Sequence, residues 1–138
     1  MVSGQWSVSE VRFSATTVDH FQHPRNVGRL ADADAVGRVD DAETDTMVEI
    51  YVKLEAGVVA RATFRTFGCS ACIAASSIAT ELLVGLTVAP SAEELDAALG
   101  GLPADKRYCA DLVAEAAQRA LTPAGSHLKD KGSPPGKN

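Results

Sequence analysis

The stretch TFGCSACIAASSIATELLVGL (residues 66–86) decides the fold. An alternating segment ends at Phe67, Gly68 permits a tight turn without steric cost, and an apolar run typical of a buried helix begins after Cys69. The thiols of Cys69 and Cys72 therefore lie at a helix start, where free backbone N–H groups and the helix dipole favour thiolate over thiol. This arrangement predicts metal ligation or nucleophilic chemistry.

An antiparallel hairpin is predicted immediately before this helix. Residues 46–54 and 58–67 each alternate between apolar and polar side chains, and Glu55-Ala56-Gly57 joins them. Pairing of Thr46 near Thr66 would bring the preceding acidic segment, residues 40–45, beside the cysteines.

Carboxylates in the acidic segment are candidate oxygen ligands. Glu43 and Asp45 are two residues apart just before the strand, so their side chains would point to one side. A short edge strand is expected earlier, over Val36 to Asp40.

Helical periodicity marks three further segments. A helix is expected from about Ser7 to Phe21, capped by Ser7 or Ser9 and stopped near His23 by the following proline. His20 and His23 are three apart, a spacing that a metal could use, but solvated histidines are the expectation. A capping box of Ser91 and Glu94 opens a short helix that ends before Gly100 and Gly101. The last helix spans about Arg107 to Leu121 and places Cys109 in its first turn on the inward face.

Composition indicates one domain of ordinary size. The chain has 138 residues, 46% hydrophobic and 22% charged, with a formal net charge of −5. The negative charge excludes general nucleic-acid binding, and no secretory signal or membrane-spanning run is seen. Three cysteines without an export signal favour reduced thiols in a cytoplasmic protein. The domain is expected to cover residues 1–121, with a disordered tail over 122–138.

The pair Cys69-Ser70-Ala71-Cys72 alone is compatible with half a zinc site, a redox pair or two small buried residues. Together with Cys109 and the carboxylates it indicates a mixed sulfur and oxygen site for zinc or iron. The residues themselves leave that choice open.

Three separated motifs resemble the U-type iron-sulfur cluster assembly scaffold family, the IscU, SufU and NifU N-terminal type. They are Val18 to Gly28 (VDHFQHPRNVG), Thr66 to Ser77 around Cys69, and Lys106 to Glu115 around Cys109. The resemblance runs from about Val18 to Leu121, with the motifs in the family's order.

The resemblance implies a set of cluster ligands. Cys69 and Cys109 fall on the family's second and third cluster cysteines, and Asp45 falls on its aspartate. The first cysteine is replaced by Glu43, and Cys72 is an additional thiol that could take its place. In the same comparison, Tyr108 stands where some members have a histidine.

The resemblance also implies an α+β fold, a small antiparallel sheet of about three strands packed against helices. The implied function is a scaffold, not an enzyme, which receives sulfur from a cysteine desulfurase and iron. It would build a transient [2Fe-2S] cluster for acceptor or carrier proteins, with Zn²⁺ as an occupant of the apo form. Residues 102–106 (LPADK) differ from the family's chaperone-binding motif, which argues against recognition by the dedicated chaperone. A homodimer is left open.

Two alternatives remain at this point. The missing first cysteine allows a zinc-binding relative that acts as a desulfurase activator or adaptor. The pair of Cys69 and Cys72 allows a thiol-disulfide oxidoreductase.

Overall fold

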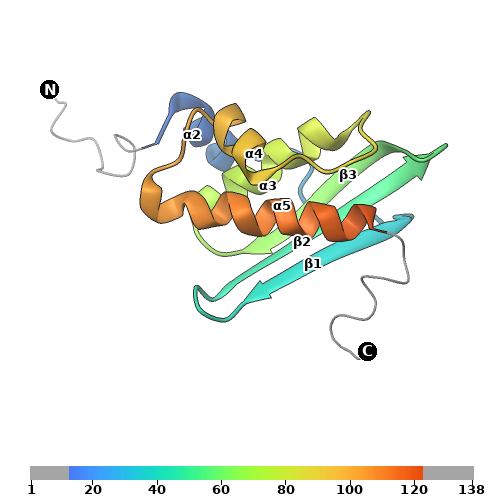
Figure 1. Cartoon of the computed structure of the whole chain (residues 1–138), viewed down its shortest axis with the longest axis horizontal. Helices are drawn as coiled ribbons and strands as arrows, with labels where there is room; N and C mark the ends of the chain where they lie inside the picture. Colours follow the sequence, from blue (N-terminus) through green and yellow to red (C-terminus); the bar gives the residue numbers. More distant parts are fainter. Residues whose placement is uncertain (1–12, 123–138) are drawn as a thin grey trace, which may run out of the picture.

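The structure, a computed structural model, describes residues 13–122 as one antiparallel sheet covered by helices. The sheet has the order β1-β2-β3. Its strands and the helices are β1 (Ala35–Asp41), β2 (Thr46–Glu55), β3 (Val58–Phe67), α2 (Ala15–Gln22), α3 (Ser70–Leu83), α4 (Ala92–Ala98), η2 (Ala104–Lys106) and α5 (Arg107–Leu121). The helices lie over one face of the sheet (Figure 1). The predicted α+β fold with a three-stranded antiparallel sheet is confirmed.

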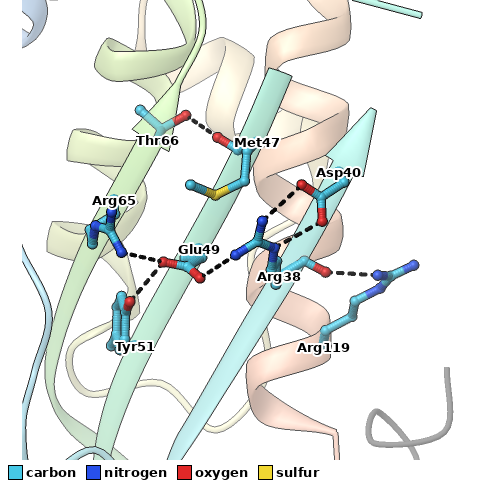
Figure 2. Close-up of polar contacts among 8 residues, drawn as sticks. All are labelled: Arg38, Asp40, Met47, Glu49, Tyr51, Arg65, Thr66 and Arg119. Carbon is cyan, nitrogen blue, oxygen red and sulfur yellow. Dashed lines mark hydrogen bonds and ion pairs between the residues drawn. The ribbon is translucent and has the colours of Figure 1, made fainter. Parts of the chain in front are cut away.

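Strand β2 is buried on both faces, which simple alternation does not predict. Val48, Ile50 and Val52 are fully buried in the core. On the opposite face Glu49 is only 8% exposed, because Arg38 of β1 and Arg65 of β3 donate hydrogen bonds to its carboxylate at 2.8 and 3.3 Å (Figure 2). The Tyr51 hydroxyl donates a third, at 2.7 Å. Charge pairing thus covers the sheet face that carries no helix.

The hairpin register differs from the predicted one. Val48, rather than Thr46, lies opposite Thr66, and a β-bulge or irregularity between Lys53 and Leu54 shifts the pairing. Thr46 instead comes close to Gly68, where an added Cβ would lie 3.1 Å from the threonine Cγ2. The mouth of the hairpin therefore does reach the turn that carries Cys69.

The helices after the hairpin begin close to the predicted positions. Helix α3 ends at Leu83, whereas the apolar run predicted it to continue to Leu86. In α4 both halves of the capping box are present: Ser91 Oγ accepts from the Glu94 N–H, and the Glu94 carboxylate accepts from the Ser91 N–H. Helix α5 has the predicted bounds, and Cys109 is fully buried on its inward face.

The helix near the N-terminus is shorter than predicted. It begins at Ala15, with Ser14 as N-cap accepting a hydrogen bond from the Thr17 N–H. Phe13 and Ser14 are not helical, so the predicted helix does not run unbroken from Ser7, and the predicted caps Ser7 and Ser9 lie outside the described residues. The helix ends before His23, as Pro24 requires.

His20 is buried, which corrects the expectation of a solvated histidine. Its Nδ1 lies 2.7 Å from Ser77 Oγ of α3, and Ser77 Oγ also accepts from the Arg25 N–H at 2.9 Å. The Ser77 hydroxyl hydrogen is therefore available to Nδ1 of a neutral imidazole. His20 anchors α2 on α3, a role that short-range sequence pattern does not reveal.

Within residues 13–122, no helix is long and apolar enough to cross a bilayer.

Burial of His20 predicts a loss of stability in mild acid. Burial lowers the pKa of His20 and Arg25 acts in the same direction, against opposing effects of Glu81 and Asp19. In the unfolded chain His20 binds a proton near pH ~6.5, whereas in the folded chain it does so only at lower pH. The free energy of unfolding therefore falls as the pH drops below ~6.5. Urea midpoints at about pH 7.5 and about pH 5.5 measure this fall.

The His20→Gln variant should lose less stability over the same pH interval than the wild-type chain. The control is His23→Gln, because His23 is exposed. An equal pH dependence in wild type and His20→Gln would contradict the prediction.

Candidate metal centre

Three free cysteines meet where α3 and α5 begin. The Sγ atoms of Cys69 and Cys109 are 3.5 Å apart, those of Cys69 and Cys72 are 3.9 Å apart, and those of Cys72 and Cys109 are 2.8 Å apart. Among the described residues, these three form the group of potential ligands whose atoms all lie within 4.8 Å of one another. Sulfurs this close can bind a single metal ion or one iron of a cluster.

Local sequence explains why the sulfurs converge. Cys69 is the N-cap of α3, and its carbonyl accepts the first helical hydrogen bonds, from the Cys72 and Ile73 N–H groups. Its side chain makes no capping bond, so the sulfur is free to face α5. Cys72 follows three residues later on nearly the same side of the helix. Because Cys109 lies in the first turn of α5, the two helix starts bring all three thiols together.

The three thiols differ in exposure and in acidity. Cys69 is partly exposed, whereas Cys72 and Cys109 have no exposed surface. Hydrogen bonding with Cys109 and then with Cys72 lowers the pKa of Cys69 far below its ordinary value. The hydrogen bond to Cys69, the contact with Cys72 and burial raise the pKa of Cys109 strongly. Contact with Cys109 lowers the pKa of Cys72, but the neighbouring Cys69 and burial outweigh it and raise that pKa to about 12.

Tyr108 is a fourth polar group at the centre. Its hydroxyl lies 3.9 Å from the Cys69 sulfur. Burial and the adjacent Cys69 raise the pKa of Tyr108, so the phenol stays protonated and can donate to the Cys69 thiolate. From the sequence, Tyr108 was identified only as a residue that replaces a histidine of the family. Its position directly before Cys109 was the signal that could have placed it at the metal centre.

The carboxylates of Asp45 and Glu43 are not part of the three-sulfur group. Both residues are exposed in the turn between β1 and β2, where Asp45 adopts a φ of 56°. Asp45 lines a hollow of about 510 Å³ on the open side of the sheet. It also directly precedes Thr46, which lies against Gly68. The turn is thus next to the cysteines, and ligation by either carboxylate stays a prediction.

Alkylation should single out Cys69. Because it is partly exposed and its pKa is lowered, iodoacetamide should modify it first, and the rate should change little between about pH 8 and about pH 6.5. An ordinary thiol would slow more than about tenfold over that interval. Peptide mass spectrometry of timed samples measures the order, and Cys69→Ser is the control. Equal rates at all three cysteines would contradict the prediction.

Comparisons with known proteins identify the family of the chain. Residues 12–126 match the family described as NifU-like N terminal domain. The chain is 42% identical over 113 residues to "Iron-sulfur cluster assembly scaffold protein IscU 1" of Archaeoglobus fulgidus, covering 79% of this chain and 74% of that protein. It is 33% identical over 121 residues to the IscU scaffold protein of Azotobacter vinelandii, covering 79% of this chain and 91% of that one.

A solved structure shares the fold. The putative SUF-system scaffold protein of Fervidobacterium islandicum superposes with a TM-score of 0.62 at 16% identity, covering 82% of this chain and 98% of that one. With a family match over most of its length and relatives above 30% identity, the chain belongs to the NifU-like N-terminal domain family, the U-type scaffold family.

Proposed function

We propose that this chain is an iron-sulfur cluster assembly scaffold. It receives sulfur from a cysteine desulfurase together with iron, builds a transient [2Fe-2S] cluster, and passes the cluster to acceptor or carrier proteins. The observation that carries the proposal is the group of three unbridged thiols at two helix starts, one of them open to solvent. The scaffold names of relatives at 33 to 42% identity support it over the adaptor and oxidoreductase alternatives.

The donor set suits a cluster that must leave again. Cys69, Cys72 and Cys109 supply soft thiolate ligands, with Cys72 in place of the missing family cysteine. Asp45 supplies a harder, weaker oxygen ligand from the adjacent turn, and Glu43 is the weaker candidate. A centre with one labile ligand binds iron while remaining exchangeable. Zn²⁺ is a suitable occupant of the same sulfurs before iron arrives.

On this proposal the protein binds the cluster and transfers it to another protein, and it does not act as an enzyme. Its free cysteines suit the reducing cytoplasm. The partners are a desulfurase and cluster acceptors, without nucleic acid.

Quantification of iron, acid-labile sulfide and zinc after anaerobic purification and reconstitution tests the proposal. We expect iron and sulfide in equal amounts, a visible charge-transfer spectrum, and loss of that spectrum when an apo-ferredoxin is added and becomes loaded. Tightly held zinc that iron and sulfide do not displace, with no transferable cluster, would instead indicate the adaptor role.

A further inference from the structure

The cysteine triad of Cys69, Cys72 and Cys109 can carry out redox chemistry as well as bind a metal. Sulfur from a persulfide arrives at the oxidation level of elemental sulfur, whereas a cluster contains sulfide, so each sulfur must gain two electrons. A pair of thiols that becomes a disulfide releases two electrons. Cys72 and Cys109, with sulfurs 2.8 Å apart, are such a pair.

Access divides the triad into one entry thiol and two internal thiols. Cys69 is partly exposed, so a persulfide donor can reach it. Cys72 and Cys109 have no exposed surface, so a donor cannot reach them directly. The internal pair does contact the entry thiol, because Cys109 Sγ lies 3.5 Å from Cys69 Sγ.

We propose that the triad reduces a sulfane sulfur bound at Cys69 to sulfide, with Cys72 and Cys109 as the electron source. The inference rests on the proposed function, since it assumes that sulfur reaches this site as a persulfide. It assigns the additional Cys72 a redox role beside its role as a ligand.

The reaction has one sulfur transfer followed by two thiol exchanges. The donor first transfers one sulfur atom to Cys69, leaving the donor as a thiol and Cys69 as a persulfide. Cys109 then attacks Cys69 Sγ and gives its proton to the leaving sulfur, so that a Cys69–Cys109 disulfide forms and H₂S leaves. Cys72 next attacks Cys109 Sγ, which forms the Cys72–Cys109 disulfide and releases Cys69 as a thiol. In total, one persulfide and two thiols become one thiol, one disulfide and H₂S, so atoms and electrons balance.

The order of exchanges leaves the entry thiol free. The final disulfide links the first turns of α3 and α5 inside the protein, and Cys69 can accept another sulfur. Each chain carries out one reduction before an external dithiol must reduce the disulfide.

The test uses reduced, metal-free full-length protein without desulfurase or iron. One equivalent of glutathione persulfide is added anaerobically, samples are quenched with an alkylating agent, and sulfide and peptide masses are measured. We expect about one sulfide per chain, a Cys72–Cys109 disulfide and an alkylated Cys69. The Cys69→Ala variant should take up no sulfur.

Two variants separate the steps. Cys72→Ala should still release sulfide but stop at a Cys69–Cys109 disulfide, with Cys69 closed to alkylation. Cys72→Ala/Cys109→Ala should keep the added sulfur on Cys69 and release no sulfide above the protein-free background. Circular dichroism checks that each variant is folded. If the double variant does not fold, Cys72→Ala still tests the proposal, because it should stop at the Cys69–Cys109 disulfide.

The proposal is overturned if the wild-type chain retains the added sulfur as the double variant does, or if the double variant releases as much sulfide as wild type. Either result leaves the scaffold proposal intact, because cluster reconstitution uses inorganic sulfide and needs no internal reduction. Conversely, a failed cluster transfer with normal sulfide release would reject the scaffold role alone.

Discussion

The Cys109→Ser variant is expected to show no visible sulfur-to-iron charge-transfer absorbance after reconstitution with iron and sulfide. Cys109 lies within 3.5 Å of both other cysteine sulfurs and is fully buried at the start of α5. Among the described residues, there is no fourth thiol that could replace it. Cys69→Ser should have the same effect, because Cys69 supplies the exposed sulfur of the site. A wild-type spectrum from either variant would reject the ligand assignment.

A matched pair of variants then identifies the replacement for the missing cysteine. Cys72→Ala should weaken the absorbance severely, since its sulfur contacts Cys109 at 2.8 Å. Glu43→Ala should have little effect, because Glu43 is exposed and lies outside the three-sulfur group. The opposite result, with cluster loss in Glu43→Ala and a wild-type spectrum in Cys72→Ala, would make the glutamate the ligand. Circular dichroism of the apo proteins controls for unfolding.

The largest stability effect is expected from Gly37→Ala in β1. A Cβ at this position would lie 1.9 Å from the Ala116 carbonyl oxygen and 2.5 Å from the Ala120 backbone nitrogen, both in α5. Backbone atoms within a helix cannot move aside as a flexible side chain can, so α5 must shift off the sheet. Overpacking of this severity should cost more than about 3 kcal/mol of the free energy of unfolding. Urea unfolding followed by circular dichroism measures it.

Gly101→Ala is the matched control for this glycine. Gly101 has a φ of +91° but nothing lies within 4 Å of its added Cβ, so the substitution strains the local backbone without a collision. We expect a loss of about 1 to 2 kcal/mol there. If Gly37→Ala costs no more than Gly101→Ala, then β1 and α5 are not packed as closely as the structure indicates.

The sequence by itself determined the features that depend on short-range interactions. The alternation over residues 46–67 predicted the hairpin, since side chains alternate across a strand with period two. The capping box predicted the start of α4, because Ser91 and Glu94 satisfy each other's backbone N–H groups. The bounds of α5 followed from its helical stripe. The family resemblance added a predicted set of ligands. The short-range pattern left open whether the metal is zinc or iron.

Only the tertiary structure decided features that join distant segments. The register of β2 on β3 depends on an irregularity between Lys53 and Leu54. The residues of the turn do not predict this irregularity. His20 is buried because Ser77, 57 residues away, offers it a hydrogen-bond partner. The difference among the cysteines likewise arises from packing: Cys72 and Cys109 are 37 residues apart in sequence, and the docking of α3 against α5 brings their sulfurs together. That docking also buries them while Cys69, at the tip of α3, remains partly exposed, because the burial of a side chain depends on what packs over it.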